Sequence, residues 1–375
     1  MSWITAEAAL AQLQTKPQTL YANVSRGRIQ SRPDPADSRR SLYRLEDVER
    51  LAQRRPGPGR TATVASQTIT WGEPVMPTAI STIADGRLYY RGKDAVGLSQ
   101  TMTLEAVAGL LWACADPDFG GGTETESDSA LSALAGLANR QLPTLGRTIA
   151  VLRGDAIETV NSLAMALTGS QRSDWALHLR LAHHWRRPDS ADMLRRALVL
   201  LAEHELNAST FAVRVAASTG ASLSAATLAG IAALGGPLHG GAAVAMRDLS
   251  ETAEHRGAPS AINVYLQQGR PVPCVGHRLY PMGDIRARAL MDQFDLPPIY
   301  AELDDAIQSK VGEQPNIDFA LTALAAAFDL PDNAPLTLFT LGRSIGWLAH
   351  ALEQVGTGTL IRPRANYVGE PINLI

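Results

Sequence analysis

Glu203-His204-Glu205-Leu206-Asn207-Ala208-Ser209-Thr210 places three titratable side chains between two segments rich in alanine and leucine. These flanking segments, Met193–Glu203 and Ala208–Ala217, consist of strong helix formers and hold few β-branched or aromatic runs. We therefore expect two helices joined by a short polar turn. Packing of two buried helices does not by itself require titratable side chains in that turn. Because the same pattern recurs along the chain, the sequence predicts a mainly α protein.

The rest of the chain supports this fold class. Its 375 residues, 45% of them hydrophobic, are enough for two or three domains with a sizeable core. An Asp85-Gly86 turn within Ile80–Gly92 is typical of a β-hairpin, and Thr63–Gln67 and Ile69–Trp71 resemble short strands. Further helical segments are predicted at Leu104–Ala113, Ser129–Asn139, Ile149–Arg153, Ala156–Leu167 and Trp175–Trp185.

Three more polar stations follow in the second half of the chain: Gly236-Pro237-Leu238-His239-Gly240, Gly276-His277 with Arg286 nine residues on, and Asn316-Ile317-Asp318. Three histidines and a carboxylate indicate acid/base chemistry. The planar guanidinium binds carboxylates in a two-pronged way, so an arginine surplus suits a substrate with several carboxylates. The chain therefore resembles an enzyme for a small polyanion, with arginines available at Arg286, Arg343, Arg362 and Arg364.

Composition excludes several classes of protein. No uninterrupted apolar stretch of about 18 residues occurs, and the N-terminus lacks a basic segment followed by an apolar one. We therefore expect neither a membrane span nor a signal peptide, and a cytoplasmic location. The two cysteines, Cys114 and Cys274, form neither a disulfide framework nor a metal-ligand spacing, so no metal site is predicted.

The charge distribution divides the chain. Residues 1–60 carry 11 Lys and Arg against 6 Asp and Glu, a net charge of +5. Because the whole chain has a net charge of −3, the remaining residues have a net charge of −8. Two prolines and two glycines in Arg54–Arg60 disfavour a helix and are typical of a linker. We predict an N-terminal module over residues 1–55, a linker over 56–62 and a second domain over 63–375.

The N-terminal module has the order helix, turn, helix, hairpin, helix. Ser2 or Thr5 would cap the first helix, Pro17 would begin the second, and Tyr43–Leu51 is amphipathic. The order resembles small winged helix-turn-helix modules of the excisionase and MerR type, whose basic wing would hold Arg32, Arg39 and Arg40. Such a positive face could bind DNA phosphates or serve as a basic cap for docking and assembly.

From about residue 78 to the C-terminus the sequence resembles the citrate synthase family in its shorter bacterial form, which includes 2-methylcitrate synthases. The resemblance rests on order and spacing over about 300 residues, and implies an almost all-helical homodimer. A smaller subdomain, at about 210–320, would be inserted into a large one and close over the cleft. The matching stretches are Asp85–Gly92, Glu203–Thr210, Gly235–Ala242, Gly276–Tyr280, Pro315–Phe319 and Arg362-Pro363-Arg364.

The family implies condensation of acetyl-CoA, or propionyl-CoA, with oxaloacetate, followed by thioester hydrolysis and without a separate cofactor. Asp318 matches the base that removes the methyl proton, His239 the donor to the thioester carbonyl, and His277 the group that polarises and protonates the oxaloacetate carbonyl. The oxaloacetate-binding positions match His204, Arg286, Arg343 and Arg362, the last supplied by the partner subunit. Arg278 and Arg364 are candidates for contacts with CoA.

The chain departs from the family pattern at Cys274, where glycine is usual, and at Ile285, which replaces a proline. The choice of thioester stays open, because one methylene is worth only about 1–3 kcal/mol in an apolar pocket. The alternative function is a DNA-binding regulator whose synthase-like domain senses oxaloacetate or CoA thioesters. A sensor has no need of a proton-abstracting Asp318, so its presence favours catalysis.

Overall fold

The computed structural model describes residues 3–13, 20, 23–24, 29–34, 37–54, 76–120, 129–169, 175–237, 239–365, 367 and 369–370. The chain divides into two compact units. The first comprises Met1–Pro77 together with Pro363–Ile375, and the second comprises Thr78–Arg362. The predicted linker 56–62 and the two strands predicted between residues 63 and 71 lie outside the described residues, so the domain boundaries drawn from sequence stay predictions.

The first unit holds a small antiparallel sheet in the order β1-β3-β2. The predicted hairpin is confirmed, and the edge strand β1 is an element that sequence reasoning missed. Aromatic Trp3 and β-branched Ile4 favour extended backbone and pair with Arg44 and Tyr43. Thr5 then caps the first helix, its Oγ1 accepting from Ala8 N at 3.3 Å. The elements are β1 (Trp3–Thr5), α1 (Ala6–Leu13), β2 (Ser31–Asp34), β3 (Asp37–Arg44) and α3 (Leu45–Arg54).

This unit has a core of its own, made by Ala9, Leu13, Leu20, Ile29, Tyr43 and Val48. The Arg32 guanidinium, expected in a basic wing, lies 4.5 Å from the centroid of the Trp3 ring. The side chains of Arg39 and Arg40 and most of the predicted second helix lie outside the described residues. The winged helix-turn-helix interpretation therefore stays a prediction.

The second unit opens with a hairpin, as predicted. Strands β4 (Ser81–Ala84) and β5 (Arg87–Tyr90) pair antiparallel, and β6 (Lys93–Asp94) pairs with β5. The two turn residues, Asp85 and Gly86, both have positive φ, at 51° and 71°. An Asp-Gly pair is suited to such a turn because both residues tolerate the left-handed region better than most.

The remainder of the second unit is helical, which confirms the mainly α fold. The predicted segments Ile149–Arg153 and Ala156–Leu167 form one helix, because a single glycine costs only about 1 kcal/mol and the buried face of the helix outweighs it. The helices are α5 (Ala95–Thr101), α6 (Leu104–Trp112), α7 (Ala130–Ala138), α8 (Ile149–Thr168), α9 (Leu177–His184), the 3-10 turn η1 (Pro188–Ser190), α10 (Ala191–Leu201), α11 (Ala208–Ser218), α12 (Leu223–Leu234), α13 (Ala242–Arg256), α14 (Ala258–Gln267), α15 (Ile285–Met291), α16 (Pro298–Lys310), α17 (Ile317–Ala327) and α18 (Ala334–Thr357).

Helix α18 is the axis of this unit. It is buried over most of its 24 residues and packs against α6, α8, α10, α11, α12 and α17. A helix apolar on all sides belongs in the interior of a large fold. The polar side chains that α18 does carry, such as Arg343 and His350, are therefore buried as well.

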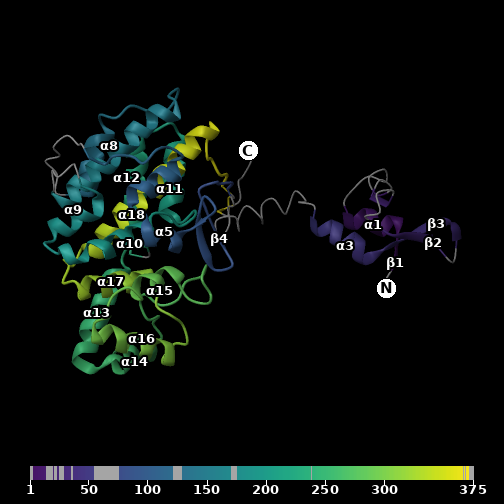
Figure 1. Cartoon of the computed structure of the whole chain (residues 1–375). Helices are drawn as coiled ribbons and strands as arrows, with labels where there is room; N and C mark the ends of the chain where they lie inside the picture. The colour runs from purple at the N-terminus through teal and green to yellow at the C-terminus, as the bar shows by residue number, and fades with distance from the viewer. Residues whose placement is uncertain are drawn as a thin grey trace. The chain divides into compact units, whose positions relative to one another are not determined.

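Helices α13 to α17 form a second group, which lies below α18 in Figure 1. The subdomain predicted at about 210–320 covers most of this group and stays a prediction. Helices α11 and α12 fall inside the predicted range but pack against α7, α8 and α18. Both are alanine-rich and apolar, so the sequence does not mark where one packing group ends and the next begins.

Within the part of the chain that the structure describes, no helix is long and apolar enough to cross a membrane.

Candidate active site

The four polar stations meet where α18 approaches the second helix group. One side of the site, here called the α18 wall, consists of residues 202–207 and α18. The other, the α15 wall, consists of residues 274–284, α15 and the start of α17. The walls touch at His204, whose ring centroid lies 5.1 Å from that of His277 and whose Nε2 lies 3.0 Å from the Tyr280 hydroxyl.

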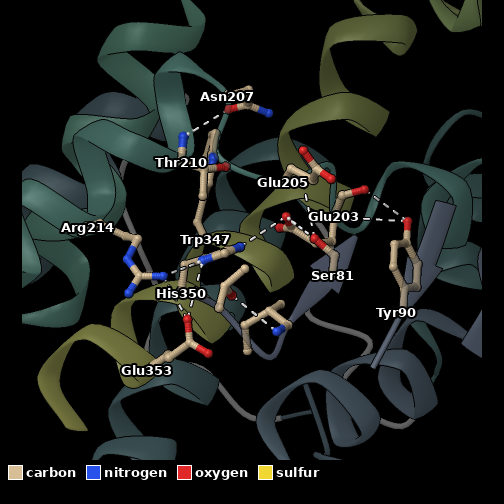
Figure 2. A network of polar contacts seen from close by, with 12 residues as sticks. Ser81, Tyr90, Glu203, Glu205, Asn207, Thr210, Arg214, Trp347, His350 and Glu353 are labelled. Atoms are coloured by element: carbon tan, nitrogen blue, oxygen red, sulfur yellow. Dashed lines mark hydrogen bonds and ion pairs between the residues drawn. The ribbon is translucent and has the colours of Figure 1, made fainter. Parts of the chain in front are cut away.

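The segment of the α18 wall that carries His204 is held on both sides (Figure 2). Glu203 Oε1 accepts from Ser81 Oγ at 3.1 Å, and Glu205 Oε1 accepts from Ile83 N at 2.8 Å. The Tyr90 hydroxyl donates to the Glu203 carbonyl at 3.2 Å. The predicted polar turn is therefore fastened to the hairpin, and His204 is presented on a fixed backbone.

Arg343 lies on α18, 1% exposed, with Nε donating to the Leu201 carbonyl at 3.0 Å. Burial lowers the pKa of Arg343, and the nearby Glu203 carboxylate raises it again in part. No carboxylate of the described residues lies within ion-pair distance of its guanidinium. Arg343 therefore has donors to spare for an anion. The helix comes this close to residues 201–203 because Gly342 and Gly346 carry no Cβ, which would collide with that segment.

In the α15 wall, Asp284 holds Arg286 in a two-pronged ion pair. Its Oδ1 accepts from Arg286 Nε at 3.0 Å, and its Oδ2 accepts from Arg286 Nη2 at 2.8 Å and from Ile317 N at 3.0 Å. Burial opposes charge on both groups, but the Arg286 charge prevails and keeps the pKa of Asp284 low. One carboxylate thus joins the start of α15 to the start of α17.

His277 and His204 are both neutral in this setting. Burial, followed by the Arg286 charge, lowers the pKa of His277 to about 4 and that of His204 well below its usual range. His277 Nδ1 accepts from Leu279 N at 3.2 Å, so the proton of the neutral ring is on Nε2. Burial also raises the pKa of Tyr280 to about 12, so its hydroxyl keeps its proton. His277 can therefore offer an N–H to a ligand.

Asp318 lies in the first turn of α17, after the cap Asn316, whose Oδ1 accepts from Asp318 N at 3.1 Å. The residue keeps some accessible surface, but the protein surrounds its carboxyl as densely as in the interior. Burial raises the pKa of Asp318 to about 6, although Arg286 works against the rise. Among the described residues no hydrogen-bond donor contacts this carboxylate, so it is free to take a proton.

His239 lies in the turn before α13, its ring 6.2 Å from that of Phe339, which in turn lies under Arg343. Its Nε2 is 2.9 Å from Ser209 Oγ, which also accepts from Trp347 Nε1 at 3.2 Å. Burial lowers the pKa of His239. A Cβ at Gly240 would collide with the Leu234 carbonyl, so glycine is needed for the tight approach around His239.

The structure thus brings together six of the residues singled out from sequence: His204, His239, His277, Arg286, Asp318 and Arg343. It does not bring Arg362 or Arg278 to them, because both side chains are exposed. Arg364 is exposed too and belongs to the first unit. Among the described residues, no group of three or more His, Cys, Asp or Glu side chains is arranged to hold a metal ion.

Sequence reasoning did not single out Ser209, Tyr280, Asp284, Trp347 or His350. Tyr280 and Asp284 are three and seven residues after His277, so their place in a polar segment was a usable signal. Trp347 and His350 follow Arg343 at helical spacings of four and seven, which put them on its face of α18. Ser209 gave no signal of its own, because serine and threonine are common at the start of any helix.

The chain is similar in sequence and in fold to known proteins. Residues 132–364 match the family model described as "Citrate synthase, C-terminal domain". The chain is 36% identical over 193 residues to "Citrate synthase 2" of Bacillus subtilis, covering 48% of this chain and 52% of that protein. It is 34% identical over 186 residues to "2-methylcitrate synthase 2" of Corynebacterium glutamicum, covering 47% and 49%. The crystal structure of citrate synthase from Thermotoga maritima matches with a TM-score of 0.64 at 27% identity, covering 82% of this chain and 98% of that one. The chain thus spans about half the length of the curated relatives it matches.

Proposed function

Since the chain belongs to the citrate synthase family, we propose that it condenses an acyl-CoA with oxaloacetate and releases free CoA. The product is citrate from acetyl-CoA or 2-methylcitrate from propionyl-CoA. The observation that carries the proposal is Asp318, a carboxylate with a pKa raised to about 6 and no donor on its oxygens among the described residues. The charges of Arg286 and Arg343 act on it, and the same site holds two neutral histidines.

Asp318 is the base in this proposal. Burial raises its pKa, so it is a stronger base than an exposed carboxylate and still ionised at neutral pH. It removes a proton from the carbon next to the thioester carbonyl, and the negative charge moves to the carbonyl oxygen. This step is feasible only if a positioned donor stabilises that oxygen as the charge develops.

His239 supplies that donor. Ser209 Oγ lies 2.8 Å from Asn207 Oδ1, to which the hydroxyl donates, and 2.9 Å from His239 Nε2. In this proposal the hydroxyl turns to donate its hydrogen bond to Nε2, so that the neutral imidazole carries its own proton on Nδ1 and donates a hydrogen bond from there to the thioester oxygen. Neutral imidazole is suited to this role because the pKa of its N–H is closer to the pKa of an enol than the pKa of imidazolium is.

Oxaloacetate lies between the two walls in this proposal. Arg343 and Arg286 hold its carboxylates, and His204 donates to the same substrate. His277 Nε2–H polarises the ketone carbonyl, the enolate carbon attacks the ketone carbon, and the ring proton passes to the oxygen of the new hydroxyl. The proton that Asp318 took from the thioester then replaces the proton lost from the ring. Water then cleaves the thioester of the condensed product, so that the acid and CoA leave.

The remaining positions complete the proposed enzyme. Arg362 would reach the site of the partner subunit in a homodimer, which accounts for its exposure in a single chain. Arg278 and Arg364, which are also exposed, would contact CoA phosphates. Closure of the α13–α17 group over the rest of the unit would then exclude water from the enolate.

The test is release of CoA thiol from purified protein with oxaloacetate and either acetyl-CoA or propionyl-CoA, together with calorimetric titration of oxaloacetate. We expect oxaloacetate-dependent release, and the ratio of kcat/KM for the two thioesters identifies the substrate. Asp318→Asn should lower kcat by about 10³-fold and leave oxaloacetate binding in place. Binding without release of thiol from either thioester would overturn the enzymatic proposal.

A second candidate function concerns residues 1–55. The first unit has a separate core and a three-stranded sheet, so it has the means to act as a module with its own ligand. We propose duplex DNA as that ligand. Titration of the full-length protein with duplex DNA should give an affinity that falls steeply with salt concentration, and the absence of salt-dependent binding would leave assembly as the module's role.

A further inference from the structure

A buried network of polar contacts links α11 to the α18 wall, and the mechanism above does not use it. Arg214 of α11 donates to Gln354 Oε1 at 3.0 Å and to Glu353 Oε2 at 2.7 Å. Its Nη1 also lies 3.2 Å from His350 Nδ1, and His350 Nε2 lies 3.1 Å from Glu203 Oε1. Figure 2 shows His350 between Arg214 and Glu203, and the side chains of Arg214, Glu203 and His350 are at most 1% exposed.

The direction of these hydrogen bonds follows from the chemistry of arginine. A guanidinium only donates, so His350 Nδ1 accepts from Arg214. The proton of the neutral ring is then on Nε2, and it points at Glu203 Oε1. The hydrogen bond from Arg214 therefore fixes the tautomer of His350, which donates one hydrogen bond to the Glu203 carboxylate.

Glu203 is next to the site in two ways. It precedes His204, and its charge is the largest influence that raises the pKa of Arg343. Its Oε1 has two donors, Ser81 and His350, whereas its Oε2 is buried with no hydrogen-bond partner among the described residues. A buried carboxylate oxygen without a donor is costly. An ion pair with Arg343 would relieve that cost, but the two groups do not make one.

We propose that His350 is a positioning residue that keeps Glu203 from pairing with Arg343. With the carboxylate held by His350 and Ser81, the guanidinium stays directed at the substrate. Without that hold, Glu203 turns to Arg343 and competes with the substrate carboxylate. This inference rests on the proposed function, because it assumes that Arg343 binds oxaloacetate.

The test compares two amide substitutions that differ in length by one methylene. The amide of His350→Gln reaches the place of Nε2 and keeps a donor for Glu203, whereas the shorter His350→Asn reaches only the place of Nδ1 and loses it. We expect His350→Asn to raise the Kd and KM for oxaloacetate by about 10-fold with little change in kcat, and His350→Gln to stay within about 3-fold of the wild type. Equal oxaloacetate affinities in the two variants would overturn the proposal.

A second variant separates positioning from a general loss of structure. Adding Glu203→Gln to His350→Asn removes the competing charge, so oxaloacetate affinity should return although the contacts of His350 stay lost. Lack of recovery would count against the proposal. The control is His178→Asn, the same change at a part-buried histidine of α9 whose charged neighbours are Glu105, Arg195 and Asp192. It should leave oxaloacetate binding unchanged.

If His350→Asn does not fold, Ser81→Ala gives the same test from the hairpin, because it removes the other donor to Glu203. Weaker oxaloacetate binding in Ser81→Ala supports the proposal, and unchanged binding overturns it. The wild-type titration keeps this result apart from the proposed function. A wild-type protein that does not bind oxaloacetate contradicts the function, whereas wild-type binding with unaffected variants contradicts only the role of His350.

Discussion

The two walls of the site each carry a buried arginine, and they treat its charge in opposite ways. In the α15 wall, Asp284 neutralises Arg286 through two hydrogen bonds, and this pairing raises the arginine pKa despite its burial. In the α18 wall, Arg343 has a backbone carbonyl as its hydrogen-bond partner, and burial lowers its pKa. The two guanidiniums are equally buried, so their partners account for the difference.

The two arginines therefore have different roles: Arg286 fixes the geometry of the site, and Arg343 is available to bind an anion. The Arg286–Asp284 pair is complete before any ligand arrives, and through Ile317 N it also fixes the start of the helix that carries Asp318. Arg343 is incomplete and gains a full partner only when an anion binds. We infer that the α15 wall sets the geometry of the site and that the α18 wall supplies most of the free energy of anion binding.

The largest expected effect comes from removing each arginine in turn. Arg286→Met should lower the free energy of unfolding by about 3–5 kcal/mol, because it leaves Asp284 buried without its partner. Arg343→Met should change the free energy of unfolding by less than about 1 kcal/mol and weaken oxaloacetate binding by about 100-fold. Urea unfolding and calorimetric titration of both variants measure the two quantities.

Each variant is the control for the other. If Arg343→Met destabilises the protein as much as Arg286→Met, the charge of Arg343 is balanced in the free protein and the comparison fails. If Arg286→Met folds normally and loses only ligand affinity, Asp284 is not the anchor of the α15 wall.

Asp318 gives the next effect, which depends on pH. Burial raises its pKa from 3.8 to about 6, so the folded state favours the protonated form. The charge therefore costs stability, beginning as the pH rises through the unfolded pKa of 3.8 and reaching its full value above about pH 6. A shift of about two units corresponds to about 3 kcal/mol.

Asp318→Asn should accordingly be more stable than the wild type at pH 8, by up to about 3 kcal/mol, and equal to it near pH 3.5. Unfolding in urea at a series of pH values gives the difference. The activity of the wild type should fall below about pH 6, as the base becomes protonated. A stability difference that does not change with pH would mean that Asp318 has an ordinary pKa and that burial does not disfavour its charged form.

Sequence reasoning could single out polar residues of the candidate site but not the contacts that hold them. His204, His239, His277 and Asp318 could be found because each is a polar residue in a segment that packing alone would fill with apolar ones. Asp284 and Tyr280 lie in the same polar segment as His277, but their contacts could not be predicted, because these depend on α15 and α17 meeting in the fold. Nothing in the sequence states that Asp284 accepts from Ile317 N, 33 residues away.

The same limit applies to packing. Alanine-rich α11 and α12 have no sequence feature that shows which helices they pack against, and the contacts with α7, α8 and α18 appear only in the structure. The strand Trp3–Thr5 was missed for a related reason: three residues are too few for an alternation, and only pairing with β3 makes them a strand. Local propensity predicts elements, whereas their partners depend on contacts distant in sequence.

A smaller effect is expected at the hydrogen bond that joins the two walls. Tyr280→Phe keeps the ring against His204 and His277 but removes the hydroxyl 3.0 Å from His204 Nε2. We expect the KM for oxaloacetate to rise by about 3- to 10-fold, with a loss of about 1 kcal/mol in stability. Steady-state kinetics with varied oxaloacetate provide the measurement. If KM is unchanged, the walls are aligned by backbone contacts alone and His204 needs no partner from α15.

Substitution of Cys274, which we expect to affect stability and not oxaloacetate binding, tests how firmly the backbone of the α15 wall is held. This residue has φ of 59°, a conformation that L side chains rarely adopt, and its carbonyl accepts from Asn316 N at 3.0 Å, next to Asp318. Its thiol also donates to the Ala242 carbonyl at 3.4 Å, close to the turn that carries His239. The hydrogen bond from Asn316 N to the Cys274 carbonyl fixes the loop, so Cys274 keeps its unfavourable positive φ.

Cys274→Gly relieves this strain but loses the buried thiol, and we expect the two terms to cancel within about 1 kcal/mol. Cys274→Val adds β-branching at a positive φ and should cost about 2 kcal/mol or more. Urea unfolding of the pair measures both values. If valine is tolerated as well as glycine, the loop relaxes away from positive φ, and the α15 wall is then less rigid than its ion pair implies. If only glycine is tolerated, the wall that carries Asp318 is fixed by its backbone as well as by Asp284.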